Sequence, residues 1–168
     1  MPTFRAEWTG LNEALNFLMM LGVNADNIVG RAIGESAIAV QDEMRNNLVN
    51  MIYSQPPGEY IRTYTLMRST HAARPGAAHA GDEGRAHSGM DLVASDPDAV
   101  WEASGHVIEA EAGSWISYAD KVHRGINQPQ ARPFVEQTMQ MAVSEMDRNV
   151  MDALIKAFAG ASRARGAA

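Results

Sequence analysis

The chain has 168 residues, a formal net charge of -6, an apolar fraction of 46% and no cysteine. This size and composition predict one globular domain over residues 1–168. The lack of cysteine excludes disulfides, thiolate metal sites and cysteine nucleophiles. The negative charge argues against tight binding of nucleic acid, because Lys and Arg supply that affinity. The longest apolar run is far below the roughly 20 residues that span a bilayer, and the N-terminus does not resemble a secretory signal, so we expect synthesis and retention in a cytoplasm.

Two helices are predicted in the first third of the chain. Leu11, Leu15 and Leu18 have helical spacing, which indicates a short helix over about residues 10–22. A longer stripe then recurs every three or four positions and predicts a long amphipathic helix over about 26–52, with Asp26 as its N-cap. The residues of this stripe are Val29, Ile33, Ala37, Val40, Met44, Leu48 and Met51.

A flexible loop is predicted over about residues 71–89, because the segment is rich in Gly, Ala, Pro and His and has no apolar period. Loops of this length in small domains are usually functional or disordered, and they often order only against a neighbouring subunit.

A small antiparallel sheet is predicted over about residues 91–122, with strands at 99–103, 105–112 and 114–122. In the middle strand, Ile108 and Ala110 alternate with Glu109 and Glu111, which places the two glutamates on one wet face. Paired glutamates could serve acid/base chemistry, but simple exposure is the favoured interpretation.

A second long amphipathic helix is predicted over about 133–159, with Pro133 in its first turn. Its apolar stripe consists of Val135, Met139, Ala142, Met146, Val150, Ala153 and Ala157. The predicted fold is therefore α+β, with two long helices packed on a small antiparallel sheet and one long flexible loop.

The sequence offers few candidate catalytic or metal-binding residues. His71, His79 and His87 are spaced by eight, whereas zinc sites usually bring two ligands within about two to five residues of each other. Gly34-Glu35-Ser36-Ala37-Ile38 lacks the closing glycine of a nucleophile elbow. We therefore predict a non-enzymatic protein without metal or cofactor; a metal-dependent hydrolase that uses the three histidines is the least favoured alternative.

Three motifs in order along the chain carry a resemblance to a known family. The first holds Tyr60, Arg62, Leu66 and Ser69; the second holds Tyr118, Val122 and Gly125; the third is Ala131-Arg132-Pro133-Phe134, which opens the last helix. With these motifs, the segment from about Ala25 to Phe158 resembles the head–tail joining proteins of tailed bacteriophages, also called neck, minor tail or tail-completion proteins.

The resemblance implies a structural virion protein, assembled in the cytoplasm of the bacterial host. It would form a ring, most often a hexamer, that joins the DNA-filled head to the tail and lines the DNA channel. The implied partners are copies of the chain and other neck and tail proteins, such as a head-closure or adaptor ring, a tail terminator or the tail tube. DNA would pass without specific binding, and no membrane is involved. A portal-side adaptor or head-closure protein is the alternative within the phage neck.

The motif residues are then expected to be core anchors or subunit contacts. Tyr118 would anchor the final strand, Phe134 would enter the core, and Arg132 would pair with a carboxylate nearby or on the next subunit. Glu109 and Glu111 are candidates to line the channel, where like charge repels DNA.

Overall fold

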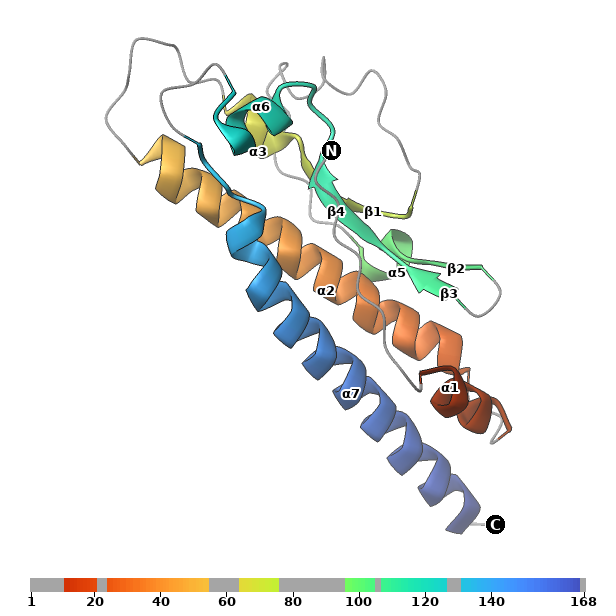
Figure 1. Ribbon diagram of the computed structural model, residues 1–168. Coiled ribbons are helices and arrows are strands. Elements are labelled where there is room, and N and C mark those ends of the chain that lie inside the picture. Colours follow the sequence, from red (N-terminus) through yellow and green to blue (C-terminus); the bar gives the residue numbers. More distant parts are fainter. Residues whose placement is uncertain are drawn as a thin grey trace.

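The computed structural model describes residues 11–20, 24–54, 64–75, 96–104, 107–126 and 131–166, which form the predicted α+β fold (Figure 1). Two long helices dominate it: α2 (Ala25–Leu48), continued by the π-helical stretch η1 (Val49–Tyr53), and α7 (Glu136–Gly166). The shorter described elements are helices α1 (Leu11–Met20), α3 (Thr65–Arg68), α5 (Pro97–Val100) and α6 (Ala119–Arg124), and strands β1 (Thr70–Ala73), β2 (Glu102–Ser104), β3 (Val107–Glu109) and β4 (Glu111–Ser114).

Helix α2 is the centre of the molecule. The helix α7 runs antiparallel along one side of it, and the strands lie along the other (Figure 1). The predicted stripe makes both contacts: Val29 and Ile33 pack with Val150 and Leu154 of α7, while Ala37 packs towards β1. Each fully buried Val, Leu or Ile contributes about 1.5–3 kcal/mol, so the two helices stabilise one another mainly through this stripe.

Small side chains let β1 and β4 lie close to α2. These strands pair antiparallel, with Thr70 opposite Ser114 and Ala72 opposite Ala112. Ala72 is buried beside Ala37. The second pair, β2 with β3, is also antiparallel.

The prediction of one sheet over 91–122 was wrong. The described strands form two separate two-stranded sheets, and β1 comes from the segment predicted as a loop. Strand β1 has only four residues and its partner β4 lies far along the chain. The segment by itself therefore does not show the alternation of polar and apolar residues that is typical of a strand. Residues 76–89 of the predicted loop lie outside the described residues.

The strand predicted at 114–122 was wrong beyond Ser114. Helix α6 occupies 119–124, with Ala119 and His123 buried and Val122 half-buried. That spacing of three and four residues places one face of a helix against the core.

Residues 99 and 100, predicted as the start of a strand, instead form the end of the helix α5. Its start is set by Asp96, whose carboxylate accepts a hydrogen bond from the Asp98 N–H at 3.0 Å, and by Pro97 in the first turn.

The predicted ends of the long helices also need correction. Asn24, not Asp26, caps α2, because the Asn24 side chain accepts the Asn27 N–H at 3.4 Å. Helix α7 begins at Glu136, after a turn at Phe134 and Val135, so Pro133 lies before the helix and not in its first turn, and the helix continues to Gly166 rather than ending near 159.

Candidate functional site

The first motif fastens α3 to the end of β4. Leu66 and Ser69 are buried. The Ser69 hydroxyl donates to the Leu66 carbonyl at 2.7 Å and lies 2.6 Å from the Ser114 hydroxyl, which therefore donates to it. Buried hydroxyls with satisfied hydrogen bonds fix one geometry, so these serines act as a structural clamp.

The second motif turns the chain back after α6. Gly125 has φ +71°, in the left-handed region, and a Cβ there would lie 2.7 Å from the Ala131 nitrogen. The turn therefore requires glycine, both for the backbone conformation and for space. The Arg132 N–H then donates to the Val122 carbonyl at 3.2 Å, which holds the third motif against α6.

The third motif places Phe134 in the core. The side chain is 0% exposed and packs in a cluster with Leu48 and Ile116. The ring of His123 meets it edge-on at 5.5 Å, and the His123 Nε2 lies 3.7 Å from a Glu136 carboxylate oxygen. Phe134 thereby joins α2, α6 and the start of α7.

Tyr118 was predicted to anchor the final strand, and that was wrong. The residue immediately precedes α6 and is half-buried against the cluster that holds Phe134. Tyr118 and Val122 therefore anchor a helix. Arg132 and Pro133 are half-buried at the surface, and a pairing of Arg132 with the next subunit stays a prediction. Tyr60 and Arg62 lie outside the described residues.

The two glutamates predicted to line a channel have different surroundings. Glu109 is exposed and lies opposite Glu102 in the β2–β3 pair. Glu111 is only 26% exposed, and its carboxylate lies 3.5 Å from the His71 Nε2. Ile108 and Ala110 pack towards the core, as the alternation predicted.

The histidines of the hydrolase alternative do not form a described metal site. His71 is mostly buried on β1, next to Glu111 and to the ring of Trp115. His79 and His87 lie outside the described residues. Within the described parts of the chain, no group of three His, Cys, Asp or Glu side chains is placed to hold a metal ion.

Polar residues on α2 that sequence reasoning overlooked fasten the helix to its neighbours. The Gln41 side chain donates to the Thr70 carbonyl at 2.9 Å, and the Arg45 Nε donates to the Thr70 hydroxyl at 2.9 Å. Burial lowers the pKa of Arg45, although the neighbouring Asp42 opposes this effect. Gln41 is buried although it is polar. Its position beside the apolar stripe of the predicted helix is the sequence signal from which this burial could have been predicted.

A stacked pair of tyrosines lies beyond the end of α2. The rings of Tyr53 and Tyr64 are 4.4 Å apart, and Tyr64 has a positive φ of 58°, which is uncommon for a bulky residue. Burial raises the pKa of Tyr53 to about 12, partly offset by a hydrogen bond from the Met67 backbone. Neither feature is visible in the sequence.

Two hollows flank the first turns of α2. One, of about 720 Å³, is lined by Arg31, Arg74, Asp98 and Trp101 among others; the second, of about 560 Å³, lies between α2 and α7. Each hollow is lined by both acidic and basic residues, so its charge favours neither an anionic nor a cationic ligand.

Comparison of the chain with protein-family models, curated protein sequences and solved structures gives no match. Among the described helices, none combines the length and the apolar character needed to cross a membrane.

Proposed function

We propose that this chain is a non-enzymatic structural protein of the neck of a tailed bacteriophage. It forms a ring, hexameric in our proposal, that joins the DNA-filled head to the tail and surrounds the path of the DNA. The observation that carries the proposal is the convergence of the family motifs. Leu66, Tyr118, Val122 and Phe134 come from three separate motifs and pack in one cluster at one end of α2.

The chemistry of the cluster supports a structural role. Ser69 and Ser114 are hydrogen-bonded to each other, and Ser69 also donates to the Leu66 carbonyl, which is the arrangement of a clamp. Gly125 and Phe134 fix a tight return of the chain onto α6 and the core. A corner fixed in this way positions a surface, and in our proposal that surface contacts other neck and tail proteins.

Localisation in the particle tests the proposal. Virions are imaged by electron microscopy after labelling with an antibody against this chain, and the density at the label is averaged to count its symmetry. We expect label at the head–tail junction and sixfold density. Virions that carry no label, although the antibody recognises the purified protein, would contradict the proposal.

The same images separate the second candidate, a portal-side adaptor or head-closure protein. A twelvefold ring directly beneath the head favours an adaptor, whereas a sixfold ring on the tail side favours the tail-completion role. Of the two glutamates proposed for the channel wall, Glu111 is the weaker candidate because it faces His71.

A further inference from the structure

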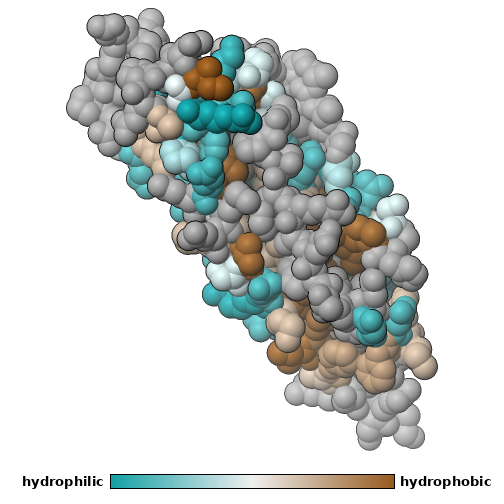
Figure 2. Space-filling view, in the orientation of Figure 1, coloured by the Kyte–Doolittle hydropathy of each residue, from teal (hydrophilic) through white to brown (hydrophobic). Residues whose placement is uncertain are grey.

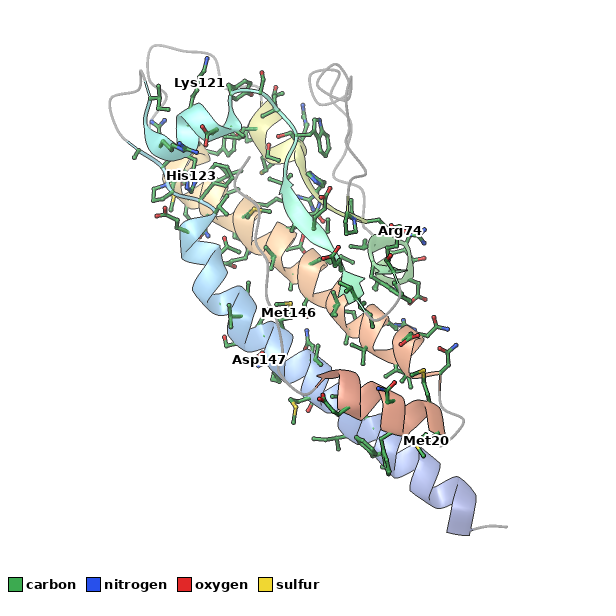
Figure 3. The ribbon with its side chains drawn as sticks, turned by 45° about the vertical axis from the view of Figure 1, so that its right-hand side comes forward. Met20, Arg74, Lys121, His123, Met146 and Asp147 are labelled. Atoms are coloured by element: carbon green, nitrogen blue, oxygen red, sulfur yellow. The ribbon has the colours of Figure 1, made fainter. Side chains whose placement is uncertain are left out.

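We propose that the end of α2 is a two-state conformational switch, which the stacked rings of Tyr53 and Tyr64 hold in a strained state, the stacked state. In the other state, the released state, α2 continues as a regular α-helix through Ser54, and Tyr64 leaves the left-handed region. The end of α2 lies beside α3 and α6, and Figure 3 labels His123 of α6 at this place. The inference goes beyond the proposed function and does not depend on it.

The first strained feature is the π-helical turn η1. The Ser54 N–H donates to the Val49 carbonyl, five residues back, at 2.8 Å. In an α-helix the same N–H donates to the Asn50 carbonyl, four residues back. Turns of the π type are rare, and they often mark functional sites within α-helices. The segment from Val49 to Ser54 contains no Gly or Pro, so its sequence is compatible with the α-helical alternative.

The side chain of Ser54 stabilises the π-helical turn. Its hydroxyl donates to the Asn50 carbonyl at 3.0 Å. It thereby occupies the acceptor that the Ser54 N–H takes in an α-helix, and such local bonds from a serine side chain compete with the regular helical pattern. Ser54 is exposed, so its replacement by alanine removes this hydrogen bond without opening a cavity in the core.

The second strained feature is the backbone of Tyr64, which has φ 58° and ψ 9°. A bulky residue rarely adopts this left-handed conformation, and it persists only where the surroundings hold it. The ring of Tyr64 is stacked on the ring of Tyr53, with 4.4 Å between the centroids and 20° between the planes. Tyr64 is 42% exposed, so its ring can leave the stack without crossing the core.

Tyr53 couples the two strained features. It is the last residue of η1, it is half-buried, and it is hydrogen-bonded to the Met67 backbone of α3. A hydrogen bond of a π turn spans five residues and that of an α turn spans four, so conversion of η1 to an α-helix rotates the Tyr53 ring away from Tyr64. Loss of the stack then removes the contact that holds Tyr64 in the left-handed region. The two features therefore relax together.

The switch acts on a surface that other molecules can reach. Tyr64 immediately precedes α3, which leads through Ser69 into β1. A molecule that contacts the exposed ring of Tyr64 in only one of the two states shifts the equilibrium by the difference between its affinities for those states. Binding at Tyr64 is thereby linked to the conformation of the end of α2.

Fluorine NMR of the protein labelled with 3-fluorotyrosine tests the switch. The chain has four tyrosines, and their resonances are assigned by single replacements with phenylalanine. Ser54→Ala removes the hydroxyl from the Asn50 carbonyl and leaves both stacked rings in place. Because this change favours the released state, we expect the resonances of both Tyr53 and Tyr64 to shift, or to split into two populations.

Ser144→Ala is the matched control. The Ser144 hydroxyl also donates to a carbonyl of its own helix, that of Met141 at 2.9 Å, and the residue is exposed, but it lies in the regular α-helix α7. This control should leave the tyrosine resonances unchanged, and circular dichroism verifies that every variant is folded. If Ser54→Ala also leaves the resonances unchanged, η1 is a fixed part of the helix and the switch is wrong.

Position 64 provides a second comparison, between Tyr64→Gly and Tyr64→Ala. Both variants lack the ring, but only glycine adopts a φ of 58° without steric cost. If the left-handed backbone belongs to the π-helical state, the glycine variant should populate that state about tenfold more than the alanine variant. The resonance of Tyr53 reports the two populations. Identical Tyr53 resonances in the two variants would overturn the coupling between position 64 and η1.

Discussion

Gly30 lies beneath the indole of Trp101, and this contact reverses the usual effect of replacing a helical glycine. A Cβ at position 30 would lie 2.4 Å from ring atoms of Trp101, whereas a Cβ at Gly160 on α7 would meet nothing within 4 Å. Both positions are inside helices, so only their surroundings differ.

Gly30→Ala should therefore lower the free energy of unfolding by about 1–3 kcal/mol through overpacking, even though alanine is intrinsically better in a helix by about 1 kcal/mol. Gly160→Ala is the matched control and should be neutral or stabilising. Urea denaturation followed by tryptophan fluorescence measures both, and equal effects of the two substitutions would contradict the close contact.

Tyr53 makes stability depend on pH in the alkaline range. Its pKa is raised from 10.0 to about 12 in the folded protein. The contribution of the protonated phenol is therefore complete below pH 10 and is lost as the pH rises through about 12. Tyr53→Phe should show a shallower fall in the free energy of unfolding across this range, measured by denaturant titration at several pH values. Parallel curves for the two proteins would show that Tyr53 titrates as in the unfolded chain.

At the scale of elements, α2 and α7 are joined by a polar contact as well as by the apolar stripe. The Asn47 side chain donates to the Thr138 hydroxyl at 3.0 Å and to the Phe134 carbonyl at 3.4 Å. Asn47 is buried, and its neighbour Asn46 is exposed.

Asn47→Ala should cost about 1–3 kcal/mol because it leaves the buried Thr138 hydroxyl without its donor. Asn46→Ala, on the outer side of the same helix, should change stability by less than about 0.5 kcal/mol. Chemical denaturation compares the two, and a similar small effect for both would mean that water replaces the Asn47 amide.

The long helices could be predicted from the sequence because each repeats its apolar residues over many turns. Val29 and Val150 lie where the stripes place them, in one cluster between α2 and α7. The strand β1 could not be predicted, because its four residues become a strand only by pairing with β4 far along the chain. Helix α6 has six residues, too few to show a period.

The candidate site was predictable in part for the same reason. Phe134 follows a proline and precedes a strong amphipathic stripe. Its position just before a core helix can therefore be predicted from its neighbours in the sequence. The clamp between Ser69 and Ser114, the contact of His71 with Glu111 and the partners of Asn47 all join distant segments. No local pattern encodes such pairs.

At the scale of the whole molecule, apolar side chains also gather on the outer surface near one end of the long helices. Figure 2 shows this hydrophobic area over α1 and the adjoining part of α7. Phe17 and Met20 of α1 and Met151 and Ile155 of α7 are 50–82% exposed. Exposed apolar areas of this kind favour binding to another molecule, and in the ring that we propose that molecule is a second copy of the chain.

In a ring of the kind that we propose, Met151→Lys with Ile155→Lys should therefore weaken the association of copies. Sedimentation of the wild type and the variant at matched concentrations measures the associated fraction, which we expect to be lower in the variant. An equal associated fraction in the two proteins would contradict a role of this area in association.

The order of the elements has a consequence during synthesis. Helix α2 is made early, and its main partner, α7, is the last described helix to leave the ribosome. Until then the part of the stripe that includes Val29 and Ile33 has no α7 to cover it, and exposed stripes of this kind promote aggregation. A chain interrupted just before α7 is therefore a candidate for chaperone capture or degradation.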